Sequence, residues 1–204
     1  MAVSKTFPQE AVREAYEAGL RIFGENRVRE LAGKIDALRE LSKAEWHLIG
    51  HLQSNKAGKA AELFDAIDSV DSLRLAEKLN SAARQLGKSV PILVEVNIGC
   101  EEAKSGVLAG SPDFEAILLS APQLDHLQVR GLMTIPPFAD DPQQARPYFQ
   151  KLRELRDMTA ARHLPRVSMD VLSMGMSHDF EVAIQEGSTC VRVGTAIFGE
   201  RATA

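Results

Sequence analysis

Short apolar runs alternate with longer amphipathic segments along the whole chain, and this alternation constrains the fold more than any other feature of the sequence. The apolar runs, which are rich in Val and Ile, predict strands, and the amphipathic segments between them predict helices. The predicted strands span residues 2–4, 21–23, 46–49, 66–70, 92–98, 129–133, 171–172 and 191–193. The predicted helices span residues 8–18, 26–41, 72–86, 114–119, 142–161 and 179–186, with a weaker helical pattern at residues 56–63.

Strands that alternate with helices form a parallel sheet that is covered by helices. Eight such units in 204 residues leave 204/8 = 25.5 residues for each unit, which suits a compact (β/α)8 barrel. An open, doubly wound sheet is the alternative, but no G-x-G-x-x-G motif follows the first strand and no linker rich in Pro, Gly or Ser divides the chain. The sequence therefore predicts an α/β protein with a single (β/α)8 TIM-type barrel over residues 1–204.

Composition and charge exclude several classes of protein. Hydrophobic residues make up 45% and charged residues 25% of the chain, which is typical of a folded globular protein and not of a disordered, collagen-like or coiled-coil chain. The formal net charge of −4 offers no general attraction to nucleic acid or anionic lipid, so we expect neither nucleic acid nor a membrane as partner. Cys100 and Cys190 show no metal-ligand spacing and no signal peptide is visible, which predicts reduced thiols, no metal site and a cytoplasmic location.

Small polar residues gather where the predicted strands end. In a (β/α)8 barrel this edge of the sheet carries the functional site, so these residues are candidates to surround a ligand. In chain order they include Lys5, Asn26, His51, Ser72, Asn97, Ser105, Thr134, Ser177, Gly194 and Thr195. The starts of the predicted strands show no such clustering.

Lys5 directly follows the first predicted strand. A lysine amine that is partly withdrawn from water there loses its proton more readily and can attack a carbonyl carbon, which would give a Schiff base to an aldehyde. The alternative is a lysine whose amine reaches solvent from the strand end and has no chemical role.

The segments after the seventh and eighth predicted strands match a place where barrels of this type often bind phosphate. Ser177 precedes a short predicted helix, and Gly194 and Thr195 follow the last strand, so a hydroxyl and several backbone N–H groups could hold an anion. The alternative is an N-cap serine and an ordinary glycine turn.

Arg192 lies between two valines on the last predicted strand and points into the barrel if the valines face the helices. A guanidinium in that position needs a partner, because an unpaired buried charge is costly. The partner is either a carboxylate or a ligand's ring nitrogen, which an arginine would keep unprotonated.

Longer motifs add a family resemblance that extends from residue 2 to residue 201. The motifs AVSKT, FGEN, WHLIGHLQSNK, SVDS, VNI with KSGV, RGLMTIPP, LSMGMSHDFEVAIQEGST and VRVGTAIFGER resemble those of the pyridoxal phosphate homeostasis proteins, which are related to the N-terminal barrel of alanine racemases. The resemblance implies a (β/α)8 barrel that binds pyridoxal 5′-phosphate (PLP). Members of that family carry about a helix and the start of the first strand before AVSKT, whereas this sequence begins inside the predicted strand.

The resemblance also implies roles for particular residues. Lys5 matches the lysine that holds PLP as a Schiff base, and Arg192 matches the arginine that faces the pyridine nitrogen. The other matched positions are Asn26 near the ring substituents and Ser177, Gly194 and Thr195 at the phosphate.

Members of the family are viewed as cofactor carriers, and the resemblance implies no established catalysis for this chain. Racemases of related fold take a second base from a tyrosine in another domain, whereas Tyr16 and Tyr148 both lie on predicted helices outside the barrel. We therefore expect a monomeric protein that carries and buffers PLP, with the apo forms of PLP enzymes as acceptors. The alternatives are a weak, racemase-like PLP enzyme and a Schiff-base aldolase that acts on a phosphorylated sugar.

Overall fold

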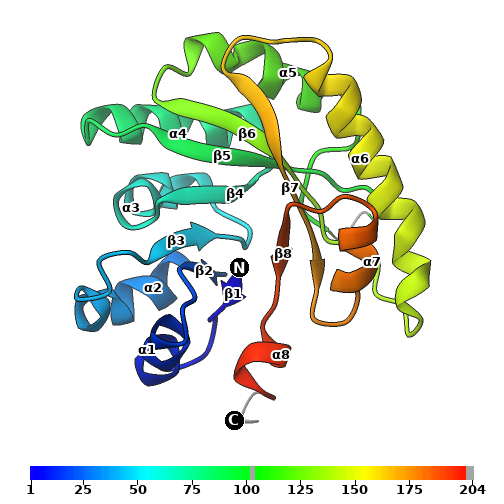
Figure 1. Cartoon of the computed structure of the whole chain (residues 1–204). Helices are drawn as coiled ribbons and strands as arrows, with labels where there is room; N and C mark the ends of the chain where they lie inside the picture. Colours follow the sequence, from blue (N-terminus) through cyan, green and yellow to red (C-terminus); the bar gives the residue numbers. More distant parts are fainter. Residues whose placement is uncertain (102–103, 201–204) are drawn as a thin grey trace.

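Eight parallel strands surround the centre of the molecule in the order in which they occur in the chain (Figure 1). The computed structural model describes residues 1–101 and 104–200, so Arg201, the last residue of the final motif, lies outside the described residues. The strands are β1 (Ala2–Val3), β2 (Ile22–Glu25), β3 (Glu45–Leu48), β4 (Ala66–Val70), β5 (Val90–Glu95), β6 (Leu127–Met133), β7 (Val167–Met176) and β8 (Cys190–Arg192).

The first and last strands meet and close the sheet into a barrel. Ala2 is paired in parallel with Val193. The Val3 N–H donates a hydrogen bond to the Val193 carbonyl at 2.8 Å, and the Val193 N–H donates to the Met1 carbonyl at 3.0 Å. Because an open sheet has two unpaired edges, this closure excludes the doubly wound alternative and confirms the predicted (β/α)8 barrel.

The helices lie outside the ring of strands (Figure 1). They are α1 (Gln9–Glu17), α2 (Val28–Lys34), α3 (Ala57–Leu63), α4 (Leu73–Gln85), α5 (Pro112–Ser120), α6 (Arg146–Ala160), α7 (Phe180–Gln185) and α8 (Thr195–Phe198), with short 3-10 turns at Ile35–Leu38, Ser54–Lys56, Ala121–Gln123 and Pro142–Ala145. The Ser72 and Ser111 hydroxyls accept hydrogen bonds from the Leu75 and Phe114 N–H groups and so cap α4 and α5. The apolar faces of the helices cover the barrel and bury Phe64, among other large side chains.

Two elements differ most from their predicted extents. The helix predicted over residues 26–41 is a seven-residue helix, α2, that continues as a 3-10 turn. The strand predicted over residues 171–172 is the ten-residue β7. Polar Ser168 and Asp170 interrupt its apolar pattern, and Met169 has a positive φ of 56°, so the strand is irregular where its sequence looks least like a strand. Gly131 on β6 is needed beside it, because a Cβ there would lie 1.7 Å from the Val171 carbonyl oxygen.

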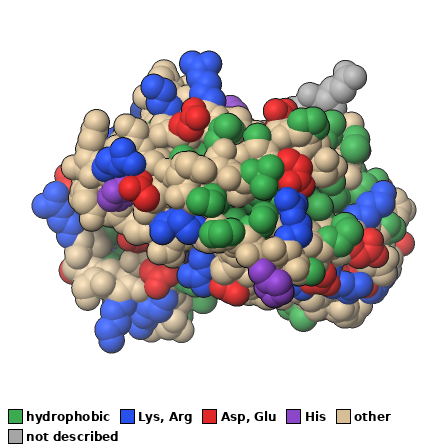
Figure 2. All heavy atoms as spheres, turned by 90° about the horizontal axis from the view of Figure 1, so that it is seen from above, with side chains coloured by type: hydrophobic (Ala, Val, Ile, Leu, Met, Phe, Trp, Pro, Cys, Tyr) green, Lys and Arg blue, Asp and Glu red, His purple; other side chains and the backbone are tan. Residues whose placement is uncertain are grey.

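The surface carries charges of both signs. Seen from above, Lys and Arg side chains are interspersed with Asp and Glu side chains, with hydrophobic side chains between them (Figure 2). In the described part of the chain, no helix has the length and apolar character that crossing a membrane requires. Both cysteines are free thiols, Cys100 exposed and Cys190 half-buried.

Candidate functional site

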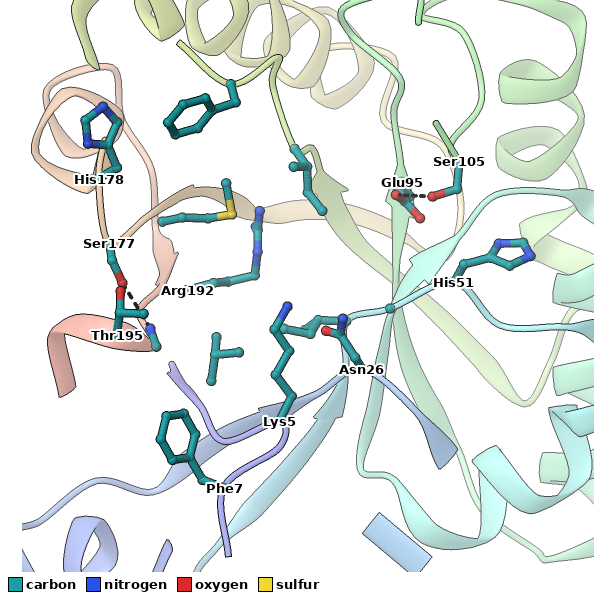
Figure 3. Close-up of a pocket in the computed structure, with 17 residues that line it drawn as sticks. Lys5, Phe7, Asn26, His51, Glu95, Ser105, Ser177, His178, Arg192 and Thr195 are labelled. Carbon is teal, nitrogen blue, oxygen red and sulfur yellow. Dashed lines mark hydrogen bonds between the residues drawn. The ribbon is translucent and has the colours of Figure 1, made fainter. Parts of the chain in front are cut away.

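A cavity of about 410 Å³ opens where the strands end, at the carboxyl edge of the barrel (Figure 3). The structure brings all six residues that were predicted to form a site to the wall of this one cavity. They are Lys5, Asn26, Ser177, Arg192, Gly194 and Thr195. They come from the ends of β1, β2, β7 and β8, which are neighbours in the barrel because β8 closes onto β1.

A tight turn carries Lys5 into the cavity. The Phe7 N–H donates to the Ser4 carbonyl at 3.2 Å, and Thr6 between them has a positive φ of 67°, which is a strained conformation for a β-branched residue. Phe7 lines the cavity and stacks on Phe198 of α8, with 4.9 Å between the ring centroids. The turn is therefore held from two sides, by its own hydrogen bond and by an aromatic contact.

A buried ion pair anchors the same turn from below. The Lys34 amine on α2 lies 2.6 Å from Oε1 of Glu25 and also donates to the Ser4 carbonyl at 3.1 Å. The Ser4 hydroxyl donates to the same Glu25 oxygen at 2.5 Å. Burial raises the pKa of Glu25, and the charge of Lys34 opposes that rise. The pair thus ties the end of β1 to β2 and α2, and it fixes the backbone next to Lys5.

Ser177 links the loops that follow β7 and β8. Its oxygen accepts hydrogen bonds from the Gly194 N–H at 3.2 Å and from the Ala196 N–H at 3.5 Å, which leaves the hydroxyl hydrogen available to donate. The N-cap alternative for Ser177 is wrong, because α7 begins at Phe180 and is preceded by Asp179. Ser177 instead joins these two loops at the wall of the cavity.

Arg192 is 3% exposed and borders the cavity from inside the barrel. Its guanidinium donates from Nη1 to the Ser173 hydroxyl at 2.7 Å and from Nη2 to the Thr134 carbonyl at 2.8 Å. No ion pair of Arg192 is found within residues 1–101 and 104–200. Burial lowers the pKa of Arg192, while nearby acidic groups that include Glu95 partly offset this effect. The carboxylate partner considered from the sequence is thus replaced by two neutral oxygen acceptors.

The opposite side of the cavity, at the ends of β3, β4 and β5, is acidic. Glu95 is 5% exposed, and its Oε1 accepts a hydrogen bond from the Ser105 hydroxyl at 2.8 Å. The His51 ring and the Asp71 carboxylate lie beside it with 2.9 Å between Nδ1 and Oδ2. We call Lys5, Ser177 and Arg192 the basic wall, and His51 and Glu95 the acidic wall. Asp71, which is paired with His51, is not among the residues that line the cavity.

Glu95 is the site residue that the sequence reasoning missed. It lies among Val94 and Val96 in an apolar strand and at the strand's carboxyl end. A lone carboxylate in such an apolar strand is costly to bury unless it is hydrogen-bonded or paired with a charge. This pattern could have identified Glu95. Apolar side chains of the cavity, such as Ile135, Phe138 and Met176, carried no comparable signal, since apolar residues occur throughout the chain.

The two tyrosines do not contribute to the cavity. Tyr16 lies on α1 and Tyr148 on α6, and both helices cover the outside of the barrel. Within the described residues, no group of three or more His, Cys, Asp or Glu side chains could hold a metal ion. The chemistry of the cavity therefore belongs to the amine, guanidinium, hydroxyl and carboxyl groups described above.

Comparison with known proteins finds a matching family model, similar sequences and structures of the same fold. The family model described as alanine racemase, N-terminal domain, matches residues 1–202. A pyridoxal phosphate homeostasis protein of Aquifex aeolicus is 45% identical over 201 residues, which are 98% of this chain and 86% of the relative. An alanine racemase of Clostridium difficile, at 16% identity and a TM-score of 0.75, covers 99% of this chain with 52% of its own length and shares the fold.

A solved structure at higher identity resembles the chain over almost its whole length. The structure of PipY from Synechococcus elongatus with PLP bound has a TM-score of 0.88 and 42% identity, and the match covers 98% of this chain and 91% of PipY. Full-length similarity at this level, together with the family match, leaves one assignment. The chain belongs to the family of the pyridoxal phosphate homeostasis proteins, whose barrel is that of the alanine racemase N-terminal domain.

Proposed function

We propose that this protein binds PLP in the cavity at the carboxyl edge of the barrel, holds it through a Schiff base at Lys5, and so carries and buffers the cofactor in the cytoplasm. The observation that carries the proposal is the convergence of Lys5, Ser177 and Arg192 on one cavity. PipY, which has the same fold and a similar sequence, has been solved with PLP bound. The name of the Aquifex relative gives the same cofactor and a homeostatic role.

The residues of the cavity fit the chemistry of the cofactor. A volume of about 410 Å³ lies within the usual range of roughly 300–1,000 Å³ for small-molecule sites. The Ser177 hydroxyl, with Gly194 and Thr195 beside it, offers donors for a phosphate, and Asn26 is placed to contact a substituent of the ring. When bound, the cofactor supplies an aldehyde that forms a reversible Schiff base with a primary amine.

Arg192 argues for carriage over catalysis. A guanidinium keeps its protons, so a ring nitrogen that faces it accepts a hydrogen bond and stays unprotonated. The cofactor then withdraws electrons less strongly, which disfavours chemistry at an amino acid's α-carbon. Arg192 is itself fixed by Ser173 and Thr134, so its orientation does not depend on the ligand.

A weak, racemase-like activity is the second candidate, and the fold shared with alanine racemase favours it. Against it stands the position of Tyr16 and Tyr148 on the outer helices. A racemase needs a base on each face of the substrate carbon, and neither tyrosine lines the cavity in this structure. As a carrier, the protein acts as a monomer and passes the cofactor to apo forms of PLP enzymes.

The visible absorbance spectrum tests the proposal directly. The purified protein with PLP should be yellow, borohydride should remove the colour, and mass spectrometry should find the reduced adduct on the peptide with Lys5. Cofactor should pass to an acceptor apo-enzyme, and alanine should not racemise at high protein concentration. A colourless protein would favour the aldolase alternative. Sustained racemisation that scales with protein and disappears in Lys5→Ala would promote the enzyme alternative instead.

A further inference from the structure

One buried carboxylate in the cavity has no place in the proposed binding of the cofactor. Glu95 is 5% exposed and lines the same cavity as Lys5 (Figure 3). The Ser105 hydroxyl donates to its Oε1 at 2.8 Å, but its buried Oε2 has no hydrogen-bond partner. Buried polar groups are nearly always hydrogen-bonded, and an unpaired one points to strain, to a role or to a missing partner.

The backbone around Glu95 is shaped to hold this carboxylate. The Val107 N–H donates to the Glu95 carbonyl at 2.9 Å, which lays the loop that carries Ser105 directly on the end of β5. Gly106 makes this crossing possible, because its φ is +104° and a Cβ there would lie 2.7 Å from the Asn97 nitrogen. This path places the Ser105 hydroxyl on one carboxylate oxygen of Glu95 and leaves the other, buried oxygen without a hydrogen-bond partner.

Three charged or titratable groups face Glu95 from neighbouring strand ends. Asp71 after β4 disfavours a second negative charge, while His51 after β3 and Arg192 on β8 favour it. Burial, which is the largest effect, raises the pKa of Glu95. A carboxyl group in this setting exchanges its proton closer to neutral pH than an exposed glutamate does, which is the property of an effective general base or acid.

We propose that the acidic wall is a subsite for the ammonium group of an incoming primary amine, and that Glu95 takes the proton which this amine must lose before it can displace Lys5. The proposal rests on the Schiff base proposed above. An unpaired carboxylate oxygen attracts an ammonium group, and the apolar Ile135, Phe138 and Met176 at the same cavity suit the carbon chain of such a ligand.

The exchange balances without any further reactant. The incoming nitrogen gives one proton to Glu95 and forms a C–N bond to the cofactor's former aldehyde carbon. A second proton moves from the incoming nitrogen to the Lys5 nitrogen of the protonated Schiff base, and the bond from carbon to the Lys5 nitrogen breaks as the new C=N bond to the incoming nitrogen is completed. The proton held by Glu95 then passes to the released Lys5 amine. Glu95 therefore ends in its initial state, and release of the cofactor to amines becomes a reaction that this barrel itself assists.

The kinetic test compares two amines on the PLP-loaded protein. Stopped-flow absorbance follows the loss of the Schiff base with ethylamine, which is an ammonium ion near neutral pH, and with methoxyamine, which is uncharged there. Glu95→Gln should slow exchange with ethylamine about 100-fold and should leave exchange with methoxyamine within about twofold of wild type. The acidic limb of the pH–rate profile for ethylamine should also disappear. The matched control is Glu62→Gln, because Glu62 lies on α3, is half-exposed and is paired with Lys59.

A second measurement does not depend on the Schiff base or on the Glu95→Gln variant. Carbon-detected NMR of carboxyl groups should show that ethylammonium lowers the pKa of Glu95 in the apoprotein, in wild type and in Lys5→Ala alike. Equal slowing with both amines would assign Glu95 a structural role and overturn the proposal, as would unchanged exchange or an unmoved carboxyl titration. If wild type never forms a Schiff base, the proposed function fails, and the titration still decides whether the ammonium subsite exists.

Discussion

The basic wall and the acidic wall of the cavity both form at strand ends, but they carry groups of opposite charge. Both consist of side chains at the carboxyl ends of parallel strands, β7, β8 and β1 for the basic wall and β3 and β5 for the acidic wall. On the basic wall, the Ser177 oxygen accepts a hydrogen bond from the Gly194 N–H, and the Arg192 guanidinium donates to Ser173 and Thr134. The acidic wall retains an unpaired oxygen on Glu95 and a half-exposed His51.

In the proposed function, this difference separates the groups that hold the ligand from those that exchange it. Groups that the protein already holds by hydrogen bonds keep their orientation, so they define where an anion and a ring can lie. Groups with unsatisfied capacity gain by binding something new or by moving a proton. The fold supplies the strand ends, and the pattern of hydrogen bonds behind them decides which wall fixes and which wall reacts.

The largest expected effect is on the basic wall, from Lys5→Ala. The proposed covalent attachment should be lost completely, so that the yellow colour and the borohydride-reducible adduct are absent. Folding should persist, because the change lies at a strand end. Absorbance and mass spectrometry of the loaded variant check this. A colour that survives the substitution would move the attachment to another amine and break the comparison of the walls.

Lys34→Met should destabilise the protein by about 3–5 kcal/mol, because it leaves Glu25 buried without its cationic partner. Glu25 is 0% and Lys34 12% exposed at the side chain. The loss should be smaller at pH 5 than at pH 8, since the already raised pKa of Glu25 rises further in the variant and lets it become neutral. Urea unfolding at the two pH values measures this. An equal loss of stability at both pH values would show that the Lys34–Glu25 pair does not anchor the turn at Lys5 electrostatically.

In the proposed site, Ser177→Ala removes one hydrogen bond to the phosphate, worth about 1.5–3 kcal/mol. The affinity for PLP should therefore fall roughly 10- to 150-fold, while pyridoxal, which lacks the phosphate, should bind with nearly unchanged affinity. Titration of the apoprotein with both ligands tests the assignment. Equal losses for the two ligands would remove Ser177 from the phosphate site.

The smallest expected effect is on the free energy of unfolding, and it comes from two His–Asp pairs, His47 with Asp68 and His51 with Asp71. His47 on β3 lies 3.1 Å from Asp68 on β4. Burial alone would lower the pKa of His47, but the hydrogen bond and the charge of Asp68 raise it above its usual value. Because the folded-state pKa is raised, the pair stabilises the fold fully below about pH 6.5, and this contribution is lost as the pH rises through the folded-state pKa.

His47→Gln should accordingly reduce the free energy of unfolding more at pH 5.5 than at pH 8.5, as urea titrations would show. The matched control is His51→Gln at the cavity mouth, where the His51 side chain is 57% exposed. Exposed ion pairs contribute little to stability, so this variant should keep the stability of wild type at both pH values. A larger effect from His51 would mean that the acidic wall serves the fold as well as the site.

The sequence predicted the barrel because its pattern of strands and helices is strictly alternating. Each predicted strand overlaps a strand of the structure, from Ala2–Val3 to Cys190–Arg192, and strand ends in a parallel barrel necessarily meet. That rule brought Lys5 and Ser177 to notice, whereas Arg192 was identified from its place between two valines on the last predicted strand. The irregular β7 was underestimated, since Met169 with its positive φ breaks the periodicity on which strand prediction depends.

What the sequence did not reveal are interactions that exist only after folding. The contact of Lys34 with Glu25 and Ser4 joins three elements, and the bond from Gly194 to Ser177 joins two loops. Neither leaves a local motif. Glu95 was overlooked for a related reason. Its place in the cavity depends on the hydrogen bond from Ser105, which lies on the loop after β5.

At the junction between β1 and β8, ligand binding and closure of the barrel are thermodynamically linked. β1 has two residues and β8 three, so few backbone hydrogen bonds hold this part of the ring, and Lys5 and Arg192 lie on either side of it. A ligand that contacts both residues stabilises the pairing of β1 with β8. Amide hydrogen exchange at Val3 and Val193 should therefore slow as PLP saturates the protein, by a factor that grows with ligand concentration over its dissociation constant.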